Sequence, residues 1–210
     1  MVSIGEKEPA TAMMDGTFDP LHGGHIGQLL RAHVVHPFER AFILVNKHPV
    51  HKPRASALHH RVQMARLAMA EVRDLPFDYE IVATHSTLDF DTQNPIDYKV
   101  TGPDSIISDL ADSARHPFLT RWRIIALAFP GVACQELEAS IAAVGGELRE
   151  SMRYELVEES DVPLMNYNFD TDTVVTSLVH STDIRTGSHS SLVPASVHEY
   201  IRDNRLYGRE

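Results

Sequence analysis

The sequence is poor in cysteine, which excludes a fold held together by disulfides. Cys134 is the single cysteine in 210 residues, so no intramolecular disulfide is available. It lies in no CxxC motif or Cys/His set, and we interpret it as a small apolar residue of the core. A chain of this length can bury an ordinary hydrophobic core without such links. We therefore expect a protein of a reducing compartment, the cytoplasm.

Positive charge is also scarce. The chain has 19 Lys and Arg against 29 Asp and Glu, which gives a formal net charge of −10. A protein that binds nucleic acid over its whole surface needs basic residues in excess, so we expect no nucleic-acid partner. Most of the basic residues are Arg, whose forked guanidinium suits phosphate and carboxylate. Any anionic ligand must therefore be bound by a few local groups.

Long hydrophobic runs are missing as well. No stretch reaches the roughly 18 apolar residues of a membrane span, and residues 1–10 lack the basic region and apolar core of a secretion signal. We expect no membrane partner. The chain also shows no internal repeat and no Gly-, Ser- or Pro-rich linker, so we predict a single domain over residues 1–210.

Short apolar runs alternate with segments of helical periodicity along the chain. We predict strands at 10–14, 41–45, 78–83, 98–101, 123–128, 153–157 and 174–179, and helices at 25–35, 57–72, 105–111, 134–144, 182–186 and 194–204. Gly145 and Gly146 are expected to cap the helix 134–144 at its C-terminus. Loops are predicted at 47–56, 84–97 and 158–172. The alternation predicts an α/β fold: a Rossmann-like, open, mostly parallel sheet with helices on both faces and a small C-terminal helical piece.

The segment GTFDPLHGGH, residues 16–25, carries the most specific chemistry. It follows the first predicted strand and opens the first predicted helix, the place where open parallel sheets bind ligands. Its glycines let the backbone approach a ligand closely, and the helix start offers N–H groups to an anion. His22 and His25 lie on one side of the first turn and reach the same bound group. Taken alone, the pair is also compatible with local capping, and it lacks the further ligands of a zinc site.

Residues 16–25 resemble the (H/T)xGH signature of the nucleotidylyltransferase superfamily, in the form found in nicotinate mononucleotide adenylyltransferases. Further segments resemble that family in the same order along the chain. His-Lys at 51–52 is similar to its PPHK loop, TGPDS at 101–105 to its GxDS turn, and STDIR at 181–185 to its (S/T)xxxR motif. Residues 192–207 are similar to its closing LVP and Tyr-Ile helix. The resemblance covers nearly the whole chain.

The resemblance implies an enzyme that moves AMP from ATP to the phosphate of nicotinate or nicotinamide mononucleotide and releases pyrophosphate, a step of NAD biosynthesis. It implies that His25 donates to the α-phosphate, that His22 and Arg185 hold the triphosphate, and that Lys52 neutralises the mononucleotide phosphate. Mg²⁺ is expected to bridge ATP oxygens. The implied ATP-binding residues are Gly16, Thr17, Phe18, His22, His25, Gly102, Asp104, Ser181, Thr182 and Arg185.

Two segments depart from the family pattern. Residues 85–92 read HSTLDFDT, which is acidic and lacks the Tyr-Thr pair associated with the nicotinate carboxylate, so the choice between acid and amide stays open. His180 replaces the first Ser before the second signature. Trp122, the single tryptophan, is open to two interpretations: half-buried packing, or stacking on the pyridine ring of the substrate.

Alternatives remain at both the residue and the protein level. Taken without the family, Lys52 is compatible with a surface residue, Asp104 with a helix cap, and the segment 181–185 with ordinary capping. Another nucleotidylyltransferase is a second function, either a phosphopantetheine adenylyltransferase or an alcohol-phosphate cytidylyltransferase. A non-catalytic nucleotide-binding protein of the same fold is a third. The sequence allows a homo-oligomer and does not decide it.

Overall fold

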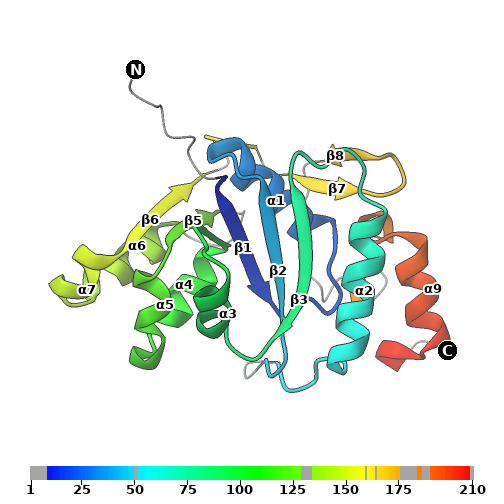
Figure 1. Cartoon of the computed structure of the whole chain (residues 1–210), viewed down its shortest axis with the longest axis horizontal. Coiled ribbons are helices and arrows are strands. Elements are labelled where there is room, and N and C mark those ends of the chain that lie inside the picture. The colour runs from blue at the N-terminus through cyan, green and yellow to red at the C-terminus, as the bar shows by residue number, and fades with distance from the viewer. Residues whose placement is uncertain are drawn as a thin grey trace.

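Six parallel strands form the central sheet of the computed structural model, which describes residues 9–49, 52–128, 134–158, 160–163, 165–175, 184–185 and 190–208. The strands are β1 (Thr11–Gly16), β2 (Arg40–Asn46), β3 (Asp78–Thr84), β4 (Tyr98–Thr101), β5 (Arg123–Leu127) and β6 (Arg153–Val157). Their spatial order is β3-β2-β1-β4-β5-β6 (Figure 1). The order reverses between β1 and β4, and ligands of open parallel sheets bind at such a reversal.

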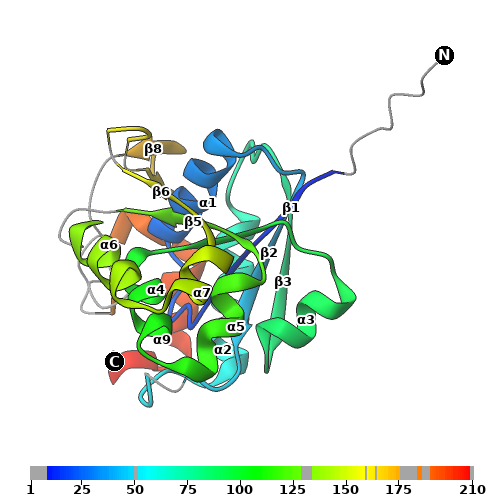
Figure 2. The same cartoon turned by 90° about the vertical axis from the view of Figure 1, so that its left-hand side faces the viewer.

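Helices cover both faces of this sheet. They are α1 (Gly23–Val35), α2 (Leu58–Ala70), α3 (Thr87–Gln93), α4 (Pro103–Leu110), α5 (His116–Thr120), α6 (Cys134–Ala143), α7 (Gly146–Ser151) and α9 (Ala195–Asp203). Figure 2 shows α2 and α3 on opposite sides of β2 and β3. One core cluster joins α1, α2 and α9 to one face of the sheet, and two others join α3 to α6 to the opposite face. The predicted α/β fold class is confirmed.

The central strands are buried on both faces, as their continuous apolar sequences predict. Met14 and Ile43 belong to the cluster with α1 and α2, whereas Met13 and Phe42 belong to the cluster beneath α3. All four side chains are at most 4% exposed. Alternation along each strand thus divides one apolar run between two cores.

Helix α1 also carries a buried cation that fixes the ends of two strands. Arg31 is 1% exposed, and its guanidinium donates to the carbonyl oxygens of Ala128 at 2.8 Å and Val162 at 2.9 Å, with longer bonds to Val157 and Glu158. These carbonyls lie at the end of β6 or beyond the ends of β5 and β6. Arg31 therefore connects the helix that begins at the signature segment to the carboxyl edge of the sheet.

Several local predictions differ from the structure. Helix α3 forms inside the predicted loop 84–97, where the Ser86 hydroxyl accepts a hydrogen bond from the Asp89 N–H at 3.3 Å and caps the helix. Inside the predicted loop 158–172, strand β7 (Asn166–Asn168) pairs antiparallel with β8 (Thr173–Val175). Gly145 is not a C-terminal cap: its φ is −58°, and it precedes α7 as the N-cap.

Two predicted C-terminal elements are described only in part. Strand β8 covers the start of the predicted strand 174–179, and 176–179 lie outside the described residues. Of the predicted helix 182–186, only residues 184 and 185 are described, and both are helical. No helix in the described part of the chain has the length and apolar character needed to cross a membrane.

Candidate active site

The two histidines of the signature segment cap helix α1 reciprocally. His22 is the N-cap residue, and its Nδ1 accepts a hydrogen bond from the Gly24 N–H at 3.1 Å. The Nδ1 of His25 accepts from the His22 N–H at 3.3 Å. This is the geometry of a capping box, with imidazoles in place of the usual Ser or Thr and Glu. A neutral imidazole that accepts at Nδ1 carries its proton at Nε2, so each ring holds a donor at its outer nitrogen.

The turn before the histidines is strained and tightly packed. Phe18 has a φ of 49°, a left-handed conformation that costs a residue with a side chain roughly 1–2 kcal/mol. Its ring is 3% exposed and meets the His25 ring edge-on, with centroids 5.0 Å apart. A Cβ at Gly16 would lie 3.0 Å from the Phe18 ring, a tight contact that would require the ring to shift. Phe18 thereby fixes the orientation of His25.

A second buried arginine holds this turn from helix α2. Arg61 is 1% exposed, and its guanidinium donates to the carbonyl oxygens of Thr17 at 2.7 Å and Ser56 at 2.8 Å. Burial lowers its pKa from the ordinary arginine value, and nearby Asp19 opposes that shift. The guanidinium ties the backbone at Thr17 to the segment that precedes α2.

Arg185 and the loop that carries Lys52 both contact the signature turn. The Arg185 Nη1 donates to the backbone carbonyl of Asp19 at 2.8 Å, which places its guanidinium at the signature segment. Lys52 is exposed in the segment between β2 and α2, and that segment is fixed to the turn by a 3.0 Å bond from the Ser56 N–H to the Asp19 carboxylate. The structure thus brings Arg185 to the turn that precedes the histidines and puts Lys52 on a connected loop.

The TGPDS segment lies across the strand reversal from the histidines. Gly102 follows β4 and is the N-cap of α4, Pro103 occupies the first turn, and Asp104 is exposed beside them. An acid at this position interacts favourably with the positive end of the helix dipole. Because β4 is paired with β1, Gly102 and Gly16 end neighbouring strands at the same edge of the sheet.

Trp122 lies in the core and offers no open ring face to a substrate. It is 1% exposed and packs with Met13, Phe42 and Leu44. Its indole N–H donates to the Asp91 carboxylate at 2.8 Å. Of the two interpretations of this residue, packing describes the structure and stacking on a pyridine ring does not. The cause is α3, a helix within the predicted loop 84–97, which brings the Asp91 carboxylate to the indole N–H and packs Leu88 and Phe90 against the same cluster.

A buried polar cluster beside β1 was not predicted. The Lys99 Nζ lies 3.4 Å from the Asp15 carboxylate and 3.8 Å from that of Asp109, and the Lys99 side chain is 6% exposed. The hydroxyl of Thr87 donates to the other Asp15 oxygen at 3.4 Å. The signal was present in the sequence, since Lys99 is the single charged residue in the predicted strand 98–101. The opposite charges of Lys99 and the two acids thus offset one another next to β1 and β4, the strands between which the order reverses.

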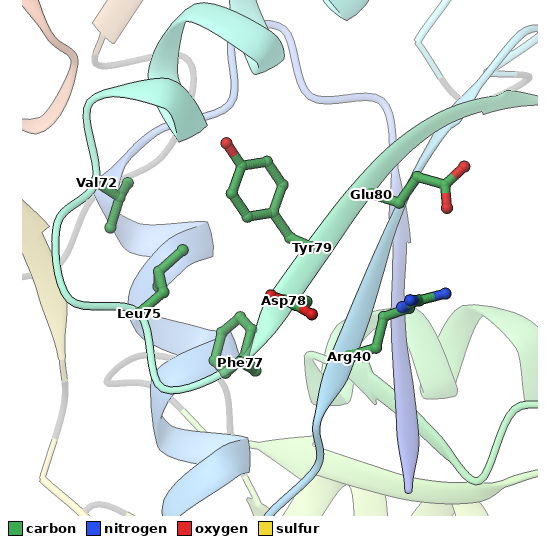
Figure 3. Close-up of a pocket in the computed structure, with 7 residues that line it drawn as sticks. All are labelled: Arg40, Val72, Leu75, Phe77, Asp78, Tyr79 and Glu80. Carbon is green, nitrogen blue, oxygen red and sulfur yellow. The ribbon is translucent and has the colours of Figure 1, made fainter. Parts of the chain in front are cut away.

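A hollow of about 430 Å³ lies at the opposite, amino end of the sheet. It is bordered by Arg40 and Asp78, which begin β2 and β3. Figure 3 shows Val72 and Leu75 facing Tyr79 on one side of β3, and Arg40 with Glu80 on its other side. The hollow is remote from the signature segment and shares no residue with it.

Some of the sequence-predicted residues lie outside the described part of the chain. These are Ser181 and Thr182, together with His51 and His180. Among the residues that the structure does describe, no three His, Cys, Asp or Glu side chains converge as a metal site.

Comparisons with known proteins identify a family and several relatives. A model of the cytidylyltransferase-like family matches residues 13–187. A probable nicotinate-nucleotide adenylyltransferase of Sodalis glossinidius is 31% identical over 116 residues, and the match covers 53% of either chain. The chain therefore spans about half the length of this relative. The protein of the same name from Chlorobaculum tepidum is 24% identical over 209 residues, with 94% of this chain and 98% of the relative covered.

Solved structures show the same fold. Plasmodium falciparum nicotinic acid mononucleotide adenylyltransferase complexed with NaAD superposes with a TM-score of 0.66 at 13% identity, covering 96% of this chain and 98% of the other. The complex of that protein with APC gives a TM-score of 0.64 over the same shares.

Proposed function

The chain belongs to the cytidylyltransferase-like family, and from this membership we propose that it moves AMP from ATP to the phosphate of nicotinate or nicotinamide mononucleotide, with release of pyrophosphate. The observation that carries the proposal is the signature turn, where two imidazoles cap the start of α1 beside the strand reversal and Arg185 binds the Asp19 carbonyl of the same turn. Relatives matched over nearly their whole length are named as probable enzymes of this kind.

The chemistry needs alignment and charge neutralisation more than a base. A phosphomonoester has its second pKa at about 6, so the attacking phosphate is mostly dianionic at neutral pH and needs no proton removed. The obstacle is the approach of two anions. Orientation of the reactants can lower such a barrier by about 7–11 kcal/mol, and fixed donors aimed at the developing charge lower it further.

The residues of the site have the groups for this task. The Nε2–H of His25 is proposed to donate to the α-phosphate, while His22, Arg185 and the N–H groups of α1 hold the triphosphate. Lys52 is proposed to neutralise the phosphate of the mononucleotide. The remaining proposed ATP contacts are the backbone at Gly16, Thr17, Phe18 and Gly102, the ribose contact of Asp104, and Ser181 and Thr182.

Magnesium is proposed to enter as its complex with ATP. The described residues offer no cluster of acids that would hold the ion alone, so phosphate oxygens and water are its expected ligands. When bound, it neutralises negative charge on the polyphosphate. We also propose a cytoplasmic location, since the single cysteine fits a reducing compartment.

A substrate panel tests the proposal. The purified protein is assayed with Mg²⁺, either ATP or CTP, and one of four acceptors: nicotinate mononucleotide, nicotinamide mononucleotide, phosphopantetheine or glycerol 3-phosphate. Pyrophosphate release is expected with ATP and a pyridine mononucleotide. Release only with phosphopantetheine or glycerol 3-phosphate contradicts the pyridine substrate, and no release with any pair contradicts the enzyme.

A further inference from the structure

The C-terminal end of the described chain reaches back to the signature turn. Tyr207 lies in the 3₁₀ turn Leu206–Gly208, which follows α9, and α9 lies alongside α2 (Figure 1). The Tyr207 hydroxyl donates to the Asp19 carboxylate at 2.6 Å, across 188 positions of sequence. Tyr207 has a φ of 61°, so its backbone is held in the left-handed region.

Asp19 connects the parts of the site to one another. Asp19 is 5% exposed, and its carboxylate accepts hydrogen bonds from both the Tyr207 hydroxyl and the Ser56 N–H. Its backbone carbonyl accepts from Arg185. A buried carboxylate is tolerated only where such donors meet it. Loss of one donor therefore weakens the placement of the turn that binds Arg185.

Tyr207 also contacts Arg185 directly. The guanidinium carbon lies 6.0 Å from the centroid of the phenol ring, within range of a cation–π interaction. Burial, and then the hydrogen bond to Asp19, raise the pKa of the Tyr207 phenol well above its usual range. The hydroxyl therefore keeps its proton at neutral pH and donates to Asp19.

We propose that Tyr207 is a positioning residue of the active site: through Asp19 it holds the signature turn and Arg185 in the arrangement that binds a polyphosphate. The inference rests on the proposed function for the identity of the nucleotide. The ligand class that we name is an inorganic or nucleoside polyphosphate, and this class does not depend on which mononucleotide accepts the AMP. Tyr207 itself need not touch the ligand.

Tyr207→Phe tests this inference because it removes the hydroxyl and keeps the ring beside Arg185. The matched control is Tyr200→Phe, which removes another tyrosine hydroxyl of the same terminal piece, one bonded to His60 Nδ1 at 2.9 Å and not to Asp19. Inorganic tripolyphosphate is titrated calorimetrically into the wild type and both variants. We expect binding about tenfold weaker for Tyr207→Phe, as for loss of one hydrogen bond to a charged group, and within about twofold of wild type for Tyr200→Phe.

Two further measurements separate positioning from mere anchoring of the chain end. Thermal unfolding is recorded for both variants, and the ATP kinetics of Tyr207→Phe are expected to show a larger rise in KM than fall in kcat. Equal loss of stability in the two variants with unchanged tripolyphosphate affinity overturns the inference, as does a wild type that binds no tripolyphosphate. Should Tyr207→Phe fail to fold, Asp19→Asn, which weakens the same bond from the other side, takes its place with the same expected outcome.

The titration also distinguishes this inference from the proposed function. Tripolyphosphate binding requires no transfer reaction, so the comparison of variants decides the role of Tyr207 even if the wild type releases no pyrophosphate with any acceptor. Conversely, an active wild type with equal polyphosphate affinity in both variants leaves the adenylyltransferase intact and removes Tyr207 from the site.

Discussion

His22 and His25 each serve the fold and the proposed chemistry with different ring nitrogens. Their Nδ1 atoms accept backbone N–H groups at the start of α1, which leaves the Nε2 position of each ring to carry the proton. Capping and catalysis are therefore not competing interpretations of the HxxH pair. The cap favours the tautomer with the proton at Nε2, which the proposed donation to phosphate requires.

The variant His25→Ala is expected to lower kcat about 10²–10³-fold, because it removes a donor aimed at charge that develops in the transition state. ATP binding, measured by calorimetry, should be mostly retained. The matched control is His33→Ala on the same helix, which also removes an Nδ1 acceptor, in this case from the Phe38 N–H at 3.3 Å, at a distance from the site. Near-normal turnover in His25→Ala removes this residue from the catalytic role.

Lys99 is expected to be essential to stability because it separates two acids inside the protein. The variant Lys99→Met leaves Asp15 without its ammonium, whereas Asp109 keeps Arg115 at 2.9 Å, and loss of one partner of a buried ion pair costs about 3–5 kcal/mol. Urea unfolding at neutral pH measures this loss. The double variant Asp15→Asn with Lys99→Met should recover part of it, and a strictly additive pair would show that the two side chains are not coupled.

At the scale of elements, the packing of α1 against the β7–β8 pair depends on two glycines one turn apart. A Cβ at Gly23 would lie 1.9 Å from the Tyr167 carbonyl oxygen, and one at Gly27 would lie 1.7 Å from that of Met165. Backbone therefore meets backbone along this side of α1. The contact holds the helix whose first turn carries both histidines.

Gly27→Ala is accordingly expected to destabilise the protein by at least about 1–3 kcal/mol, since backbone atoms must move to admit the methyl group. Gly146→Ala is the matched control: nothing lies within 4 Å of its added Cβ, so helix propensity should leave stability unchanged or slightly higher. Urea unfolding of both variants provides the comparison. Equal stability of the two would contradict the tight contact between α1 and β7.

At the scale of the whole molecule, the net charge of −10 and the anionic proposed substrates are compatible because positive groups are concentrated. Arg185 and the buried Arg61 both bind carbonyls of the signature turn, next to the N-terminus of α1. Some of the acids on the rest of the molecule are paired locally. At the amino end of the sheet, for example, Glu155 on β6 accepts from His36 at 2.8 Å and from Arg123 at 3.0 Å.

This acid predicts a pH dependence of stability. The hydrogen bond from His36, followed by the contacts with Arg123, lowers the pKa of Glu155 in the folded protein. A lowered carboxyl pKa stabilises the fold above the ordinary glutamate value of about 4.3, and this contribution is lost as the pH falls through the lower folded-state value. Urea unfolding of wild type and Glu155→Gln from pH 7 to pH 3 should show a difference that disappears at the acidic end. A constant difference would exclude this ion pair as its source.

The sequence by itself determined the strands of the sheet, the fold class and the signature turn. Central parallel strands are continuous apolar runs, and the glycines and histidines of residues 16–25 are local in sequence, so both can be read without knowledge of distant contacts. It also pointed to Arg185 and Lys52, whose roles remain predictions. The prediction of loops at 84–97 and 158–172 was wrong. Each segment contains a short element, α3 or β7, that depends on packing more than on a periodic pattern.

Only the tertiary structure decided what surrounds these residues. It buried Trp122 beneath α3, paired Lys99 with two acids from other elements, and brought Tyr207 to Asp19. The lone charge in the predicted strand 98–101 marks Lys99 but does not name its partners, and the contacts of Trp122 and Tyr207 have no sequence signature at all, because each depends on the arrangement of the whole sheet and its helices. The signature turn is a local motif, but its geometry is held by residues that only folding brings together.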